Sequence, residues 1–271
     1  MAIDLKPLWD FGNPAVSEER LRAALKAATG DDALILQTQI ARTWGLRKDF
    51  SRARDTLQSI SKELPAASAE VRARYALELG RTYASATHPP GLVTPEAKKL
   101  ARNAYESALE IAKQAHLDAL AIDAIHMLAF VDTAPADQLK WGLEALAVVQ
   151  ESSQPEAKAW EASIRNNVGY ALHQLGRYDE ALDQFQQALV LREQGTNAGA
   201  VRVAHWMIAW TLRALGRTDD AMEIQLRLER ECDAANAPDR YVYEELEILH
   251  RAEGDEGRAK HYEALKSALP S

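Results

Sequence analysis

Apolar residues recur at helical spacing along most of the chain, most clearly between residues 160 and 192. On either side of a central glycine they are Ile164, Val168, Ala171, Leu172, Leu175, then Ala181, Leu182, Phe185, Ala188 and Leu189. This spacing predicts two amphipathic helices. Gly176 suits the left-handed residue that ends a helix, and Asp179 and Glu180 suit the first turn of the next. Because two helices cannot bury both apolar faces alone, the pattern predicts further copies.

The copies are present. The segment 215–221, LGRTDDA, repeats the segment 175–181, LGRYDEA, almost residue for residue. The residues that open successive second helices are expected to be Ala53, Ala101, Trp141, Ala181, Ala221 and Ala259, in steps of 48, 40, 40, 40 and 38. The longest step contains a loop with Pro89, Pro90 and Gly91. A period near 40 with two helices per repeat predicts a solenoid, although Trp141 breaks the rule of a small residue at this position.

The predicted fold class is therefore all-α, an α-solenoid of about six antiparallel helix pairs. The pairs are expected at about 31–66, 67–115, 116–153, 154–197, 198–236 and 237–271. Residues 1–30 are expected to form an extended lead-in and an N-terminal capping helix. Asn13 and Pro14 begin that helix and Gly30 ends it. A helix without a repeat partner is typical of the cap that covers the open end of a stack.

Several residues carry a resemblance to a known family. They are Leu79-Gly80 with Tyr83; Ala101, Tyr105 and Ala108; Val168-Gly169; Gly176, Tyr178, Ala181, Phe185 and Ala188; Gly216 and Ala221. The chain resembles the tetratricopeptide repeat (TPR) family over about residues 31–269, as a bacterial-type protein. Its period exceeds the usual 34 residues and is similar to that of the TPR variants in kinesin light chains. The resemblance implies a right-handed superhelix whose first helices line a concave groove for peptides or partner helices. It also implies that small residues let the paired helices approach closely.

Composition and charge exclude several classes of protein. The chain has 271 residues, 47% hydrophobic and 27% charged, as in a folded globular protein, and its formal net charge is −8. Nothing in that balance indicates the basic face that nucleic acids require. The first residues lack the pattern of a signal peptide, and no apolar run is long enough for a membrane span. A cytoplasmic location is the expectation.

No pattern of residues indicates catalysis. The chain has no phosphate-binding glycine loop, no nucleophile elbow and neither an HExxH nor a CxxC motif. The seven histidines are scattered without ligand spacing, and Cys232 is the single cysteine, so neither a metal nor a cofactor is expected. Acidic pairs such as Asp179-Glu180 fit the starts of helices. The sequence favours a non-enzymatic protein.

The TPR resemblance directs attention to the first helix of each pair. Aligning the pairs places Gln39, His126, Glu244 and Arg251 on the groove face, together with the ten candidate binding residues Arg42, Arg74, Arg81, Phe130, Asn166, Asn167, Tyr170, Trp206, Trp210 and Arg213. Asparagine can clamp a peptide backbone, arginine can bind a carboxylate by two hydrogen bonds, and tryptophans four residues apart can offer a platform. The alternatives are that the tryptophans are buried between repeats, that Asn167 bonds a neighbouring helix, and that the arginines are solvated or pair with carboxylates of the chain itself.

Three functions remain open on this basis. The first is an adaptor that binds a protein or peptide, for which an acidic or C-terminal-carboxylate peptide would match the arginines. The second is a self-associating scaffold, because Leu8, Trp9 and Phe11 add apolar surface to the N-terminal segment. The third is a regulator that senses a ligand or signal peptide, as some bacterial TPR proteins do by resemblance. An enclosed pocket beside Tyr170 and Trp206 would favour the third, and an open, shallow channel would count against it.

Overall fold

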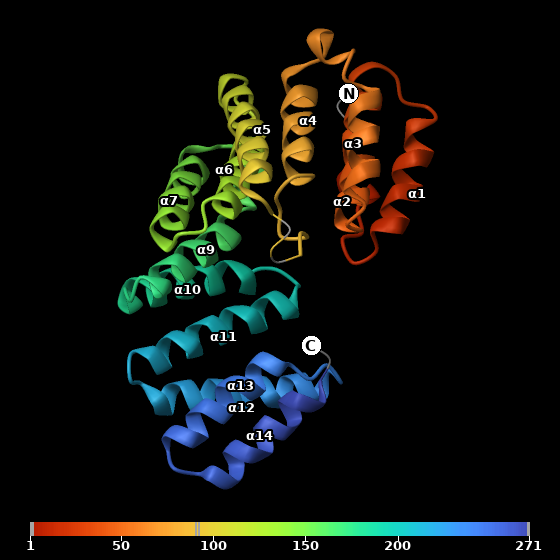
Figure 1. Ribbon diagram of the computed structural model, residues 1–271. Helices are drawn as coiled ribbons and strands as arrows, with labels where there is room; N and C mark the ends of the chain where they lie inside the picture. Colours follow the sequence, from red (N-terminus) through yellow and green to blue (C-terminus); the bar gives the residue numbers. More distant parts are fainter. Residues whose placement is uncertain (1–2, 90, 92, 270–271) are drawn as a thin grey trace. The chain divides into compact units, whose positions relative to one another are not determined.

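The computed structural model describes residues 3–89, 91 and 93–269 (Figure 1). These residues form helices joined by turns, and none of them is in a β-strand, so the predicted all-α class is confirmed. The chain divides into two compact units on either side of the bond between Trp160 and Glu161. We call the N-terminal part unit 1 and the C-terminal part unit 2, and describe each by itself.

Unit 1 contains a lead-in (residues 3–12 of the described chain), a capping helix and three antiparallel helix pairs. Its elements are η1 (Lys6–Leu8), α1 (Pro14–Leu25), α2 (Gly30–Leu46), α3 (Phe50–Ser59), η2 (Leu64–Ala66), α4 (Ala69–Arg81), α5 (Pro95–Gln114), α6 (Asp118–Val131), α7 (Pro135–Glu151) and α8 (Pro155–Lys158). The pairs are α2 with α3, α4 with α5, and α6 with α7. The first helices also pack in order, α2 against α4 and α4 against α6, so that their side chains share one face of the unit.

Unit 2 contains three further pairs. They are α9 (Glu161–Gln174) with α10 (Tyr178–Glu193), α11 (Ala198–Ala214) with α12 (Thr218–Ala234), and α13 (Arg240–Ala252) with α14 (Glu256–Ala268). The predicted turns lie at Gly176 and Gly216, whose φ angles of 73° and 76° belong to the left-handed region that favours glycine. Asp179 and Glu180 lie in the first turn of α10, as expected.

Two glycines allow paired helices to come close together. A Cβ at Gly80 on α4 would lie 2.4 Å from Cε1 of Tyr105 on α5, and a Cβ at Gly169 on α9 would lie 2.7 Å from Cε1 of Phe185 on α10. Both rings are fully buried. The same aromatic-on-glycine packing therefore holds one pair in each unit, and a larger residue at either glycine would force the helices apart.

The structure corrects the register of α7. In α10 the buried residues Ala181, Phe185 and Ala188 follow each other at intervals of four and then three residues. In α7 the buried residues with this spacing are Gly142, Leu146 and Val149, and not a series that begins at Trp141. Trp141 is half-buried, and its indole N–H donates to Oδ2 of Asp132 at 2.9 Å. A small residue thus does open this second helix, one position later than predicted.

Two predicted helix boundaries were wrong. The capping helix ends at Leu25, and Gly30, with a φ of 57°, begins α2 instead of ending α1. The helix that starts at Phe50 was expected to continue to about Leu64, with Pro65 closing it. It ends at Ser59, because the chain then turns and forms a short 3₁₀ helix around Pro65. In both places the glycine or proline correctly predicts that a helix is interrupted nearby, but it does not predict the residue at which the helix ends.

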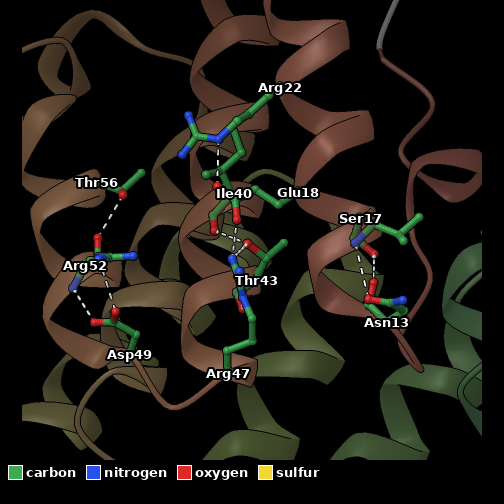
Figure 2. A network of polar contacts seen from close by, with 11 residues as sticks. Asn13, Ser17, Glu18, Arg22, Ile40, Thr43, Arg47, Asp49, Arg52 and Thr56 are labelled. Carbon is green, nitrogen blue, oxygen red and sulfur yellow. Dashed lines mark hydrogen bonds and ion pairs between the residues drawn. The ribbon is translucent and has the colours of Figure 1, made fainter.

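The capping helix is fixed to α2 by charge as well as by apolar packing (Figure 2). Glu18 on α1 is almost buried and pairs with Arg22 one turn later and with Arg47 at the end of α2. Arg47 in turn donates from Nε to the carbonyl oxygen of Thr43 at 3.2 Å. The apolar part of this contact consists of Leu21, Leu36 and Ile40, against which Leu5, Leu8 and Trp9 of the lead-in also pack.

Candidate functional site

Four charged side chains meet on the first-helix face of unit 1. Arg81 on α4 donates to Glu78 at 2.6 Å and to Asp123 of α6 at 2.5 Å. Arg42 on α2 lies 3.5 Å from Glu78 and 4.0 Å from Asp123. The carboxylates are only 3% and 9% exposed, so each is buried between two arginines. We call these four residues the charge cluster.

Within the cluster, Arg81 and Asp123 stabilise each other's charged forms. Burial alone would raise the pKa of Asp123, but the charges of Arg81 and Arg42 outweigh it and keep the pKa below its ordinary value. Burial alone would lower the pKa of Arg81, whereas the carboxylates of Asp123 and Glu78 raise it. Arg42 has weaker partners, so burial and the like charge of Arg81 lower its pKa. Two positive and two negative charges leave the cluster without net charge.

The lead-in covers the outer side of Arg42. Trp9 and Phe11 stack on each other with ring centroids 4.8 Å apart, and the Arg42 guanidinium lies 5.7 and 5.6 Å from their centroids. The indole N–H of Trp9 also donates to Oε1 of Gln39 at 3.2 Å. Two residues predicted to face the groove, Gln39 and Arg42, therefore contact the chain's own N-terminal segment.

A cavity of about 210 Å³ lies beside the charge cluster. All four cluster residues line it, and Ser85 and Thr87 form part of its polar wall. His126 and Phe130 on α6 contact each other edge to face, and the ring centroids of Trp160 and His126 are 5.7 Å apart. All three rings line the cavity. The burial of His126 lowers its pKa, so that its neutral form is favoured.

Unit 2 carries aromatic rings where unit 1 carries the charge cluster. Trp210 on α11 is nearly parallel to Trp206 one turn earlier, with centroids 5.7 Å apart, and to Tyr170 on α9, with centroids 5.9 Å apart. Tyr241 on α13 meets Trp206 edge-on at 6.0 Å. The two tyrosines are exposed and the two tryptophans half-buried. We call Tyr170, Trp206, Trp210 and Tyr241 the aromatic cluster.

The aromatic cluster lines a partly open cavity of about 550 Å³, which we call the aromatic pocket. Apolar side chains that include Val203 and Ile248 complete its wall. Arg213 on α11 donates from Nε and Nη2 to both oxygens of Glu245 on α13, at 2.7 and 2.8 Å. This pair ties α11 to α13 at the pocket wall, and the hydrogen bond to Glu245 raises the pKa of Arg213.

His173 supports the aromatic cluster from one side. Its ring stacks on Trp210 with centroids 3.3 Å apart and meets Tyr178 edge-on at 4.9 Å. Burial lowers the pKa of His173 to about 4, and the charge of Arg213 acts in the same direction. His173 is therefore neutral at physiological pH, and its uncharged ring can pack on the indole without desolvating a charge.

The ten candidate binding residues fall into three groups in the structure. Tyr170, Trp206, Trp210 and Arg213 come together at the aromatic pocket, and Arg42, Arg81 and Phe130 come together at the smaller cavity of unit 1. The other three line neither cavity: Arg74 pairs with Glu70 at 2.8 Å, and Asn166 and Asn167 are half-buried on α9. Within the described chain the buried Oδ1 of Asn166 receives no hydrogen bond.

Several residues that complete these sites were not predicted from the sequence. Glu78 and Asp123 neutralise the arginines of unit 1, and Trp9 with Phe11 covers Arg42. Tyr241 completes the aromatic cluster. One signal for it was available, because Tyr241 precedes Glu244 and Ile248 by three and seven residues and thus shares their helix face.

Neither a metal centre nor a membrane-spanning helix occurs in the part of the chain that the structure describes. In residues 3–89, 91 and 93–269 no group of three or more His, Cys, Asp or Glu side chains is arranged to hold a metal ion. None of the helices described here has both the length and the apolar character needed to cross a membrane.

Antiparallel helix pairs with first helices packed in order define a helical-repeat protein of the α-solenoid class. Residues 160–229 match the model of the tetratricopeptide repeat family. The match contains α9 to α11 and most of α12, and therefore the repeated turns at Gly176 and Gly216. The resemblance to the TPR family drawn from the sequence is confirmed. The sequence matches no curated protein significantly.

Solved structures share this fold. The apo form of RapI is 13% identical with a TM-score of 0.69, and the match covers 95% of this chain and 73% of RapI. TPR-like repeats of a putative kinesin light chain from Podosopora anserina are 14% identical with a TM-score of 0.55, over 81% of this chain and 98% of theirs. A Rap protein complexed with Competence and Sporulation Factor is 18% identical with a TM-score of 0.58, over 93% and 69%. At these identities the likeness concerns the fold alone.

Proposed function

We propose that this protein is a non-enzymatic adaptor that binds a peptide or protein segment in the aromatic pocket of unit 2. One observation carries the proposal. Four aromatic rings from three successive first helices surround a partly open cavity of about 550 Å³. Cavities of roughly 300–1,000 Å³ with mainly apolar walls are typical of binding sites.

The exposed rings explain why a partner would bind there. Tyr170 is 43% exposed and Tyr241 is 59% exposed, although both contact tryptophans. Tyrosine and tryptophan offer large contact areas at a small cost in conformational entropy, and they are enriched among residues that dominate binding energies. The Arg213–Glu245 pair holds two walls of the pocket in place before a partner arrives, which favours binding by reducing the ordering that a partner must impose.

Binding of an acidic or C-terminal-carboxylate peptide by Arg42, Arg74 and Arg81 stays a prediction. Each of these arginines already has a carboxylate of the chain within 4.0 Å. An acidic ligand would have to exchange with Glu70, Glu78 or Asp123. For this reason we place the principal site in unit 2 rather than at the arginines.

A second candidate function is a regulator that senses a small signalling peptide. Two observations favour it. A pocket lies beside Tyr170 and Trp206, although it is partly open and not enclosed as this function predicts, and one solved structure of similar fold is a Rap protein in complex with Competence and Sporulation Factor. Adaptor and sensor would use the same aromatic pocket and differ in the consequence of binding. Self-association has less support, because Leu8 and Trp9 pack against unit 1 itself, and a homo-oligomer stays a prediction.

The test is a selection of random twelve-residue peptides on phage with the full chain as bait. The bait variant is Tyr170→Ser with Tyr241→Ser, two exposed positions where the loss of a ring leaves the core intact. Phe11→Ser is the matched control, because it removes another exposed ring, 62% exposed, from unit 1. We expect the wild-type and Phe11→Ser chains to retain peptides that the double variant retains at least tenfold less well. Equal retention by all three chains, or no retention by any, would refute the proposed site.

A further inference from the structure

Resting on the proposed function, we infer that the segment bound in the aromatic pocket is cationic, with a lysine or arginine side chain lying against the rings of the aromatic cluster. The inference goes against the acidic ligand predicted from the arginines of the sequence. Three properties of unit 2 carry it: the aromatic lining of the pocket, the charge left on the pocket wall, and the net charge of the unit.

The rings of the aromatic cluster supply aromatic surface to the pocket. The planes of Trp206 and Trp210 differ by 20°, and those of Tyr170 and Trp210 differ by 21°. Trp210 is thus stacked with Tyr170 and with Trp206, His173 covers one of its faces, and Tyr241 meets Trp206 edge-on. The face of an aromatic ring is its negative side and attracts a cation, most strongly in tryptophan. The aliphatic stem of lysine or arginine also gains apolar contact on such a surface.

The charges on the pocket wall favour the same sign of ligand. Arg213 is neutralised by its two hydrogen bonds to Glu245, which is only 4% exposed. The other charged residues that line the pocket are Arg202, Asp239 and Glu244. They leave one carboxylate in excess, and Glu244 is exposed one helical turn from Tyr241 and so close to the ring edges. A cation on the rings would find a counter-charge there, whereas a carboxylate would be repelled.

The charge of unit 2 acts over a longer range. Residues 161–271 contain 19 Asp and Glu but 13 Lys and Arg, a formal net charge of −6 out of −8 for the chain. A field of this sign increases the local concentration of cationic segments and their association rate. In the charge cluster of unit 1, by contrast, two positive and two negative side chains pair with each other.

The charge composition of the selected peptides tests the inference. We expect Lys and Arg to be enriched at least about threefold over the unselected library, and Asp and Glu to be depleted, among peptides whose retention depends on Tyr170 and Tyr241. Glu244→Gln should lower the enrichment, whereas Glu223→Gln, an equal loss of charge from an exposed position on α12, should not. Tetramethylammonium chloride should elute these peptides at a concentration at which sodium chloride does not, because the quaternary cation competes for the ring faces.

The outcomes separate the two claims. Pocket-dependent peptides that are enriched in Asp and Glu, or that show no charge preference, would overturn the inference and leave the adaptor proposal in place. Equal elution by the two salts would refute the proposed contact between the cation and the aromatic rings. If no peptide depends on Tyr170 and Tyr241, the proposed function fails and the inference fails with it.

Discussion

Unit 1 and unit 2 use the same face of their first helices in opposite ways. In unit 1, Arg42 and Arg81 bind Glu78 and Asp123, and the lead-in lies over Arg42. In unit 2, the corresponding face leaves aromatic rings around a cavity, and Arg213 and Glu245 in the wall of that cavity pair with each other. The same architecture therefore gives unit 1 a face whose charged groups pair with each other, and unit 2 a face whose aromatic rings are available to a partner.

The difference teaches where binding residues should be sought in a helical repeat. An arginine on the first-helix face is a candidate for ligand binding only if the neighbouring repeat does not supply its counter-ion. Aromatic side chains have no such requirement, and the two tyrosines of the aromatic cluster stay exposed although both contact tryptophans. Position in the repeat is thus less informative than the partner that the next repeat provides.

The largest effect is expected from breaking the charge cluster. Asp123→Ala leaves Arg81 and Arg42 with one carboxylate between them in a buried site, so we expect unfolding in urea to show a loss of about 3 kcal/mol in stability. Glu151→Ala, at an exposed position at the end of α7, should change stability by less than about 0.5 kcal/mol. A loss below about 1 kcal/mol for Asp123→Ala would mean that the arginines regain water easily, and that the face of unit 1 is not closed by charge.

An intermediate effect concerns the pH dependence of unit 2. The pKa of His173 is about 4 in the fold, against an ordinary value of 6.5, so below pH 6.5 the unfolded chain binds a proton that the folded chain does not. The stability contributed by neutral His173 is fully present above pH 6.5 and is lost as the pH falls towards 4. Between pH 7 and pH 4.5, His173→Gln should lose less stability than the wild-type chain, as measured by urea unfolding at each pH.

The control for this prediction is His261→Gln, because His261 lies at an exposed position of α14. It should follow the wild-type curve. A His173→Gln chain with an unchanged pH profile would contradict the lowered pKa, and would mean that the imidazole can take up its proton while stacked on Trp210.

The smallest effect is expected from uncovering Arg42. Phe11→Ala removes an exposed ring from the Arg42 guanidinium, which should cost less than about 1 kcal/mol of stability. The informative measurement is labelling by phenylglyoxal, read by mass spectrometry. The rate at Arg42 should rise severalfold, while the rate at Arg74, which pairs with Glu70 and does not contact the lead-in, should not change. Equal rates at Arg42 in both chains would show that the ring does not shield it.

The sequence predicted the helix pairs because their signals are local. Apolar periodicity defines each helix, and the glycines at 176 and 216 define the turns. The register of α7 was missed by one residue because Trp141, next to Gly142, lies at a plausible spacing and no local rule distinguishes the two. Helix ends depend on which backbone groups find partners, and that is decided by neighbouring segments.

The candidate sites were predicted only in part, for a related reason. Tyr170, Trp206 and Trp210 meet because equivalent positions of successive first helices lie side by side, a property of the repeat itself. The pairing of Arg81 with Asp123 depends on the offset between neighbouring repeats, which the sequence does not state. The position of Trp9 over Arg42 belongs to a segment outside the repeat pattern, so periodicity carries no information about it.

The lead-in has a consequence for how unit 1 would be occupied. Since Trp9 and Phe11 belong to the same chain as Arg42, they meet it as a tethered competitor whose effective concentration is on the order of millimolar. A partner that binds this face has to displace the lead-in. The fraction of unit 1 that it occupies therefore depends on its own concentration and affinity and on the effective concentration of the lead-in. An N-terminal fusion that pulled the first eleven residues away would then act as a gain of function.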